Sequence, residues 1–246
     1  MYAFIQARMG STRLPGKMAL KLPDGKTLLE AVISRLEQHD ITPVLLTTTE
    51  ESDNELVKIA EQINLRIFRG DESNVLNRFT AAAAYFEVPE NDFVLRICAD
   101  NPYLCHWIID QTIYKTKVIP EADYISYAHD NKPGIKHHTG IFIEAVKISA
   151  LKSVAVSNNL WYNEHVTIGV YENPNHFNIH LVEIPVEWHP NFLSIRLTID
   201  DAEDWAFCQN TYNSLHQLDF PEQRKLLLSE KSWVTLMENQ ITKYQK

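Results

Sequence analysis

The sequence lacks the features of a membrane or secreted protein. No apolar run approaches the roughly 20 residues that a membrane-spanning helix needs. The N-terminus shows no charged-then-apolar signal pattern, and Met1 leads directly into an apolar segment, so we expect no cleaved leader. The three cysteines, Cys98, Cys105 and Cys208, have no C-x-x-C spacing, which indicates reduced thiols. We therefore expect a cytoplasmic protein without a membrane partner.

An excess of positive charge is also missing, because the 246-residue chain has a formal net charge of −9. Proteins that bind nucleic acid normally present a basic face, so we expect no nucleic-acid partner. The first 26 residues are an exception. Five cations and one carboxylate give them a net charge of +4, which leaves −13 for the rest of the chain. This concentration of positive charge favours binding of a small anion.

No Gly/Ser-rich linker, internal repeat or low-complexity segment divides the chain, so we expect a single domain over residues 1–246. Apolar strand patterns alternate with amphipathic helix patterns through the first hundred residues. This alternation is typical of an α/β fold with a parallel sheet between two helical layers. Strands are predicted at 2–5, 43–47, 65–68, 92–97, 123–127, 139–146, 177–186 and 193–199. Helices are predicted after Thr27 to about 39, after a capping box at Ser52 and Glu55, at 75–86, within 159–172, at 202–216 and in two short C-terminal stretches.

The segment after the first predicted strand has the composition of an anion-binding loop. It reads IQARMGSTRLPGK from Ile5 to Lys17. Its glycines allow a ligand to approach free backbone N–H groups, and Arg8, Arg13 and Lys17 supply permanent charge. An ordinary surface loop with solvated cations is the alternative. The loop fits neither G-x-G-x-x-G nor the P-loop motif G-x-x-x-x-G-K-[ST], because Lys17 is followed by Met18.

This loop resembles the signature loop of the sugar-nucleotide cytidylyltransferases, in particular the spore coat polysaccharide biosynthesis type. It is also similar to the loop of CMP-Kdo synthetase and, more loosely, of the acylneuraminate cytidylyltransferases. The resemblance extends from residue 2 to about residue 207. It implies a three-layer α/β/α nucleotide-diphospho-sugar transferase fold with a mainly parallel central sheet. It also implies transfer of CMP from CTP to a sugar or sugar acid, with release of pyrophosphate, for surface polysaccharide biosynthesis. By analogy with relatives, it further implies a homodimer.

Two aspartates each follow a predicted buried strand, Asp100 in RICADNPYL and Asp200 in LTIDDAEDW. Carboxylates in this position are suited to Mg²⁺, which takes oxygen ligands and bridges to substrate phosphates. The alternatives are a turn-capping role for Asp100 and a helix N-cap for Asp200. Both segments resemble the metal-binding segments of the family. The resemblance implies that Asp100 and Asp200 bind Mg²⁺ and that Asp201 is the N-cap of the next helix.

The resemblance places the nucleotide against the loop and two further segments. Arg8 and Lys17 are implied as catalytic groups that offset charge on the phosphates, and the backbone of residues 9–11 is expected to cradle the β- and γ-phosphates. RGDESNVLNRF resembles a family segment in which Arg78 matches and Asn74 stands where an aspartate is usual. The implied nucleotide-binding residues are Ala7, Arg8, Met9, Gly10, Ser11, Arg13, Lys17, Thr47, Thr48, Arg78 and Asp100.

The segments HHTGIFIE and NEHVT resemble family segments that face the sugar. Arg96, in RICADNPYL, also matches the family pattern. The segment Cys105-His106-Trp107 departs from the family pattern. His176 and His180 are four residues apart but lie outside any predicted helix, so we expect no zinc pair. The implied substrate-binding residues are Arg96, His137, His138, Glu144, Glu164 and His165.

Two other functions remain open at this point. The chain could use another nucleotide, such as UTP, on the same fold. It could also be a non-catalytic sugar-nucleotide binding protein, a reading that Asn74 and the departure at residues 105–107 favour. The presence of Lys17 and both predicted metal ligands argues against it. The sequence does not name the sugar.

Overall fold

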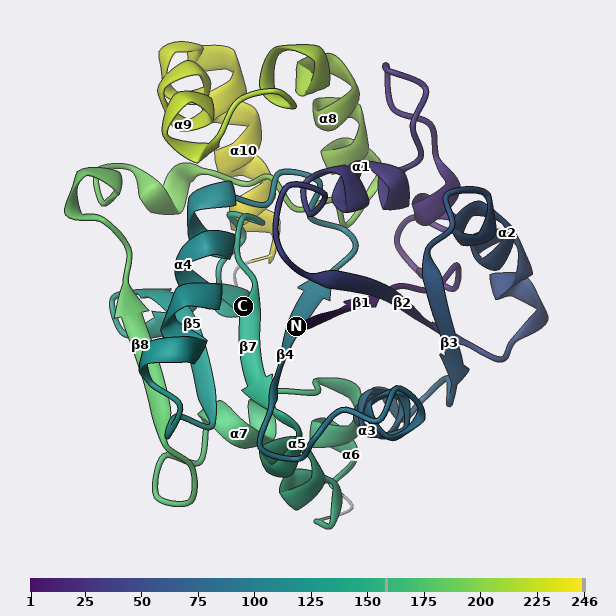
Figure 1. Ribbon diagram of the computed structural model, residues 1–246. Helices are drawn as coiled ribbons and strands as arrows, with labels where there is room; N and C mark the ends of the chain where they lie inside the picture. The colour runs from purple at the N-terminus through teal and green to yellow at the C-terminus, as the bar shows by residue number, and fades with distance from the viewer. Residues whose placement is uncertain (158, 245–246) are drawn as a thin grey trace.

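The structure, a computed structural model, describes residues 1–157 and 159–244. Its strands are β1 (Tyr2–Gln6), β2 (Thr42–Thr48), β3 (Arg66–Gly70), β4 (Phe93–Cys98), β5 (Tyr124–His129), β6 (Lys132–Pro133), β7 (Glu144–Lys147) and β8 (Ile179–Glu183). They form one sheet in the order β3-β2-β1-β4-β7-β5-β6, with β8 paired to β5 (Figure 1). The pairs β3-β2, β2-β1, β1-β4 and β5-β8 are parallel, whereas β7 runs antiparallel to β4 and β5. The central sheet is therefore mainly parallel, as predicted.

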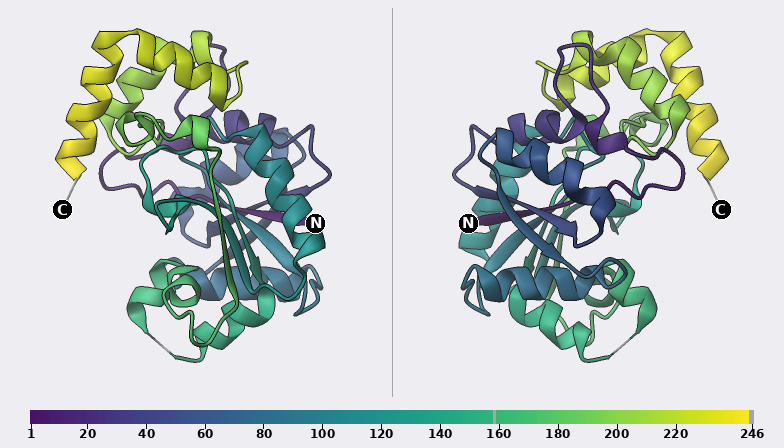
Figure 2. Two further views of the ribbon diagram at one scale, coloured as in Figure 1. Left: turned by 90° about the vertical axis from the view of Figure 1, so that its left-hand side faces the viewer. Right: turned by 90° about the vertical axis from the view of Figure 1, so that its right-hand side faces the viewer.

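Helices cover both faces of this sheet. They are α1 (Leu28–Ser34), α2 (Asn54–Gln62), α3 (Val75–Tyr85), α4 (His106–Val118), α5 (Ile148–Ala155), α6 (Leu160–Glu164), α7 (Ile168–Tyr171), α8 (Ala202–Leu215), α9 (Phe220–Ser229) and α10 (Lys231–Tyr244). Helices α1, α2, α4 and α8–α10 pack into one core, and α3, α5 and α7 into the other. Figures 1 and 2 show the two layers on opposite sides of the sheet. No helix in the described ranges is long and apolar enough to cross a membrane.

The two cores follow from the alternation of side chains along each strand. In β1, Ala3 and Ile5 point into the first core, while Phe4 points into the second. In β4, Leu95 points into the first core and Val94 into the second. A strand buried on both faces is apolar along its whole length, which is the pattern seen in the sequence. The predicted three-layer α/β/α architecture is confirmed.

The strand predicted at 193–199 is wrong. Residues 195–200 belong to no strand ladder. Their backbone bonds go to two separate loops instead: Leu197 N–H donates to the His138 carbonyl, and Ile199 N–H donates to the Asp100 carbonyl. Their alternating pattern arises because Ile195, Leu197 and Ile199 enter the core, while Thr198 and Asp200 line the site described below. The strand predicted at 139–146 is likewise shorter, since only Glu144–Lys147 pairs with neighbours.

The helix predictions also need corrections. The capping box predicted at Ser52 and Glu55 is absent, because Asp53 precedes α2 and its side chain turns inward. Thr27 is the N-cap of α1, as predicted, and the structure shows that it also forms a capping box with Glu30. Helix α1 ends at Ser34 rather than near residue 39, and the helical segment at 159–172 is split into α6 and α7. Helices α4 and α5 were not predicted, since β-branched residues weaken their helical pattern.

Candidate active site

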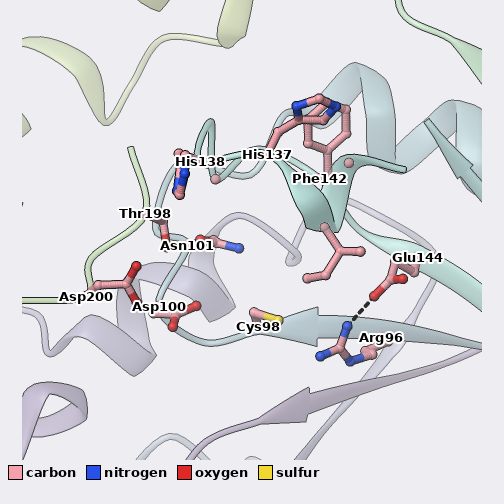
Figure 3. A pocket seen from close by; sticks show the side chains of 13 residues that line it. Arg96, Cys98, Asp100, Asn101, His137, His138, Phe142, Glu144, Thr198 and Asp200 are labelled. Carbon is pink, nitrogen blue, oxygen red and sulfur yellow. Dashed lines mark hydrogen bonds and ion pairs between the residues drawn. The ribbon is translucent and has the colours of Figure 1, made fainter. Parts of the chain in front are cut away.

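The polar residues predicted at the strand ends meet at one edge of the sheet. The loop after β1 and the ends of β4 and of the 195–200 segment line two adjoining cavities, of about 560 Å³ and about 200 Å³. Three residues line both: Arg96, Asp100 and Asp200. Figure 3 shows the smaller cavity with these three side chains along one side. Ligands of parallel α/β sheets bind beyond the carboxyl ends of the strands, and the cavities lie there.

A buried carboxylate anchors the loop that follows β1. Asp53 is only 1% exposed, and its Oδ1 accepts the backbone N–H of Met9 at 2.7 Å. Its Oδ2 accepts the hydroxyls of Thr47 (2.7 Å) and Thr48 (2.6 Å) and the N–H of Thr48 (3.0 Å). Burial raises the pKa of Asp53, but these hydrogen bonds outweigh burial, so the pKa lies below its ordinary value. No sequence signal had marked Asp53 as part of the site.

This anchor engages two of the groups that were predicted to contact the nucleotide. Thr47 and Thr48 are buried with their hydroxyls bound to Asp53, and neither lines the larger cavity. Of the backbone amides at residues 9–11, that of Met9 bonds to Asp53 and that of Ser11 to the Met9 carbonyl. Among these three amides, only that of Gly10 has no protein partner within the described ranges. The amides at 9–11 therefore shape the loop more than they cradle a ligand.

The larger cavity is lined by four of the predicted cations, Arg8, Arg13, Lys17 and Arg78. Lys17 is 9% exposed, and its Nζ donates to Asp100 Oδ2 at 3.0 Å and to the Ile199 carbonyl at 2.7 Å. Predicted loop residues Ala7 and Ser11 line the same cavity. These cations, which come from the loop and from α3, give the cavity the charge of an anion site.

Arg78 is the most informative of these cations. It is 1% exposed, and its Nη1 donates to the Asp71 carbonyl at 2.6 Å. Its Nε has no hydrogen-bond partner, and no ion pair joins it to a carboxylate in the described part of the chain. Burial and the nearby charge of Arg8 lower the pKa of Arg78, yet a guanidinium stays protonated in proteins. The nearby charges of Asp53, Asp71 and Glu72 compensate part of this buried cation, and the cavity that it lines can take a further anion.

Asn74, the residue that stands where the resemblance expects an aspartate, is the N-cap of α3. Its side-chain oxygen accepts the N–H of Asn77 at 2.8 Å. Asparagine and aspartate are equally good N-caps, so the exchange preserves this structural role. Asn74 therefore gives no support to a loss of activity.

Asp100 and Asp200, a hundred residues apart in sequence, are held together by the backbone hydrogen bond from Ile199 to the Asp100 carbonyl (2.9 Å). The carboxylate of Asp200 accepts hydrogen bonds from the guanidinium groups of Arg13 and Arg196, each at 2.9 Å. Both carboxylates line both cavities. Two carboxylates that open onto the larger, cationic cavity are a donor set that suits Mg²⁺. Asp201 is the N-cap of α8, as predicted, accepting the N–H groups of residues 203 and 204.

A buried network forms the floor of the smaller cavity. Glu144 forms an ion pair with Arg96 and also accepts the hydroxyls of Tyr124 (2.5 Å) and Thr167 (2.9 Å). Both oxygens of Glu144 are thus used within the protein. Arg96 also donates to the side chain of Gln6 at 3.4 Å. Glu144 therefore holds Arg96 at the junction of the two cavities, as the dashed line in Figure 3 indicates.

His138 presents a hydrogen-bond donor to the smaller cavity. Its Nδ1 lies 2.8 Å from Nη1 of Arg196, and since a guanidinium only donates, Nδ1 must be the acceptor. The ring proton is then on Nε2. Burial lowers the pKa of His138, and the charge of Arg196 lowers it further, so the ring is neutral at pH 7. Arg196, which also binds Asp204, was missed because a single arginine among the apolar residues of a predicted strand has no distinctive pattern.

The other predicted substrate-binding residues are divided between the cavities. His137 lines the smaller cavity, and its Nε2 lies 3.2 Å from the Lys132 carbonyl. Glu164 and His165 line the larger cavity instead, beside the cations. Burial raises the pKa of the Cys98 thiol, which lines the smaller cavity, to about 11, so it stays protonated and is no nucleophile.

The departure at residues 105–107 lies away from both cavities. The carboxylate of Asp219 accepts the N–H groups of His106 (2.9 Å) and Trp107 (3.2 Å) at the start of α4. The same carboxylate pairs with Arg35 at 3.2 Å. This segment therefore joins α4 to the C-terminal helices and casts no doubt on the chemistry.

A family profile described as cytidylyltransferase matches residues 2–233. The chain belongs to the cytidylyltransferase family. A cytidylyltransferase structure from Leptospira borgpetersenii is similar with a TM-score of 0.82 and 25% identity, covering 95% of this chain and 96% of that one. The spore coat polysaccharide biosynthesis protein SpsF of Bacillus subtilis is 30% identical over 218 residues, 85% of this chain and 84% of SpsF. An uncharacterised protein of Methanocaldococcus jannaschii is 35% identical over 210 residues, 82% of this cytidylyltransferase and 78% of the relative.

More distant structures share the fold of this cytidylyltransferase. A CMP-Kdo synthetase complexed with CTP is similar with a TM-score of 0.63 at 13% identity, covering 87% of this chain and 98% of that one. The predicted family and the nucleotide-diphospho-sugar transferase fold are thus both confirmed.

Proposed function

We propose that this cytidylyltransferase transfers CMP from CTP to a hydroxyl group of a sugar or sugar acid and releases pyrophosphate. The observation that carries the proposal is the junction of the two cavities at Arg96, Asp100 and Asp200. The larger cavity is cationic and takes the nucleotide. The smaller one, of about 200 Å³, has the size and the polar groups for a sugar ring. The α-phosphate of a nucleotide in the first then meets a hydroxyl of an acceptor in the second.

The reaction needs positioning and charge compensation more than covalent chemistry by the protein. The acceptor oxygen forms a bond to the α-phosphorus and loses its proton, and the bond from the α-phosphorus to the β-phosphate oxygen breaks. Lys17 and Arg8 compensate negative charge on the phosphates, and the buried Arg78 adds charge from the other wall. Arg96, held by Glu144, lies where the two substrates meet.

We propose Asp100 and Asp200 as the residues that hold Mg²⁺. Their oxygens are the ligand type that Mg²⁺ prefers, and substrate phosphates complete its coordination in enzymes of this kind. When bound, the ion supplies positive charge to the phosphate oxygens. The protein's own part is to present both carboxylates on the shared wall of the two cavities.

The neutral ring of His138 supports a polar acceptor. Its Nε2–H is a donor on the wall of the smaller cavity and suits a hydroxyl or carboxylate oxygen. The similarity to SpsF supports a role of the product in polysaccharide synthesis. Cytoplasmic location and a homodimer remain predictions.

Nucleotide binding is tested first by thermal unfolding with Mg²⁺ and each of CTP, UTP, ATP and GTP. A ligand at one hundred times its dissociation constant stabilises the fold by about 2.7 kcal/mol. For a chain of this size that corresponds to a rise in Tm of roughly 5–10 °C. We expect this rise with CTP, its loss in Lys17→Ala, and its retention in the matched control Lys21→Ala, which changes an exposed lysine outside the cavities.

Pyrophosphate release with a panel of sugars and sugar acids then tests catalysis. If Tm rose with UTP, ATP or GTP but not with CTP, the substrate would be that nucleotide instead of CTP. Binding of CTP without pyrophosphate release from any acceptor would favour the non-catalytic binding protein. The absence of any rise in Tm with the four nucleotides would refute the assignment of the larger cavity.

A further inference from the structure

A second group of metal-ligating side chains lies outside the two cavities. His129 ends β5, Glu183 ends β8, and His189 follows the short 3-10 helix (Val186–Trp188) after β8. One ligand atom of each lies within 4.8 Å of those of the other two. His129 is buried, whereas His189 and Glu183 are partly open to solvent. None of the three lines either cavity of the active site.

The distances within this cluster fit one small metal ion. Glu183 Oε1 lies 3.3 Å from Nδ1 of His129 and 3.6 Å from Nε2 of His189. Two ligand atoms bound about 2.1 Å from a tetrahedral zinc ion are about 3.4 Å from each other. The rings of His129 and His189 meet edge to face with centroids 4.8 Å apart, so they approach Glu183 from different directions. Two imidazoles and a carboxylate form a ligand set that proteins use for zinc.

The backbone holds the cluster in place without help from a ligand. Asp130 and Asn131 both have positive φ, 52° and 58°, and form the tight turn between β5 and β6. The N–H of Asp130 donates to Glu183 Oε1 at 3.0 Å and so orients this carboxylate. Asp130 Oδ2 lies 3.7 Å from Nε2 of His129, on the ring edge opposite Glu183. A carboxylate behind a histidine ligand is the usual arrangement that orients the ring towards a metal.

We propose that His129, Glu183 and His189 bind one divalent transition-metal ion of the Zn²⁺ class. Nitrogen ligands favour Zn²⁺, Co²⁺, Ni²⁺ and Cu²⁺ over Mg²⁺, so this site is chemically distinct from Asp100 and Asp200. The ion would join the end of β5, the end of β8 and the segment after β8.

The site also adjoins the active site through one aromatic contact. The ring of His137, which lines the smaller cavity, packs 6.0 Å from the ring of His129. The members of this cluster are 54 and 6 residues apart, so no local sequence pattern links them. A metal at the cluster would thus fix the ring of His129. This ring packs behind His137 in the wall of the smaller cavity, which we propose takes the acceptor.

The test uses the full-length protein after treatment with a chelator and titration with Co²⁺ and Zn²⁺. Co²⁺ reports its coordination through visible absorption bands, and Zn²⁺ affinity is measured in competition with a chromophoric chelator. We expect one equivalent of Co²⁺ with the intense bands of a four-coordinate site, displaced by Zn²⁺. Zn²⁺ affinity should fall at least tenfold in His189→Ala and in Glu183→Gln, both at partly exposed positions where the fold tolerates change.

Two control variants identify where the metal binds. His176→Ala removes an exposed histidine outside the cluster and should leave the affinity unchanged. Asp200→Asn should also leave it unchanged, because the proposed Mg²⁺ site is separate. The proposal is overturned if no equivalent of Co²⁺ binds, if affinity survives in both His189→Ala and Glu183→Gln, or if it is lost in Asp200→Asn.

Discussion

Replacing Asp53 with asparagine tests whether a buried carboxylate holds the loop after β1 in place. Asparagine has nearly the same shape but only one acceptor oxygen, whereas Asp53 receives four hydrogen bonds on two oxygens. With its oxygen at the Oδ2 position, asparagine keeps the bonds of Thr47 and Thr48 but turns an amide donor towards the N–H of Met9. The contact that is lost is therefore the one that anchors the loop.

The size of the effect follows from these contacts. A hydrogen bond to a charged group contributes about 1.5–3 kcal/mol, and three further bonds weaken when their acceptor becomes neutral. We expect the free energy of unfolding to fall by about 3 kcal/mol, which corresponds to a Tm lower by roughly 6–12 °C in a chain of this length. We also expect CTP-dependent stabilisation to weaken, because the loop that carries Arg8 and Arg13 loses its anchor. Thermal unfolding of Asp53→Asn beside Glu51→Gln, an exposed neighbour, measures both effects.

The pH dependence gives an independent check. The pKa of Asp53 is lower in the folded than in the unfolded protein, whose value is near 3.8. The unfolded chain therefore binds the proton more readily, and the stability that Asp53 provides is present above this pH and is lost as the pH falls towards the folded pKa. The difference in Tm between wild type and Asp53→Asn should thus shrink below about pH 4. If Asp53→Asn melts within 2 °C of Glu51→Gln at neutral pH, the anchoring role is refuted.

Three further predictions concern the reaction itself. Lys17→Ala should lower the rate of pyrophosphate release by about 100-fold or more, since a charge beside the phosphates is lost. Asp200→Asn should raise the Mg²⁺ concentration for half-maximal rate by about tenfold, measured by Mg²⁺ titration; an unchanged titration would exclude Asp200 as a ligand. The rate should fall only as the pH drops below 6.5, where His138 gains a proton and repels Arg196, and this acid limb should be absent from the pH profile of His138→Gln.

The sequence predicted the parallel half of the fold well, because a buried parallel strand and an amphipathic helix each have a clear local pattern. It failed where the same pattern has another cause. Residues 195–200 alternate like a strand, but the alternation separates core residues such as Leu197 from site residues such as Asp200. Helix α4 escaped notice because β-branched residues weaken its pattern and because its N-terminal amides are bound by Asp219, 113 residues later, rather than by a neighbouring cap. Such long-range caps have no local signal.

The sequence identified those site residues whose chemistry is rare in a loop. Cations among glycines and aspartates after strands are unusual enough to be noticed, and the structure brings Lys17, Asp100 and Asp200 together with Arg78, which only the family resemblance had indicated. The residues that position them escaped prediction. Asp53 looks like any acidic residue before a helix, and its role depends on a contact with a loop 44 residues earlier. Sequence patterns thus show which groups can react, while the contacts that orient them emerge only from the fold.

The charges of the site link the two binding steps of the proposed reaction. Asp100 is paired with Lys17, and Asp200 with Arg13 and Arg196. Phosphates that enter the larger cavity compete with the two carboxylates for Lys17 and Arg13. Less positive charge then compensates Asp100 and Asp200. The carboxylates then bind a divalent cation more strongly. A divalent cation that binds before the nucleotide has to displace Lys17 and Arg13 itself. Because such coupling is reciprocal, nucleotide and metal should each raise the affinity of the protein for the other.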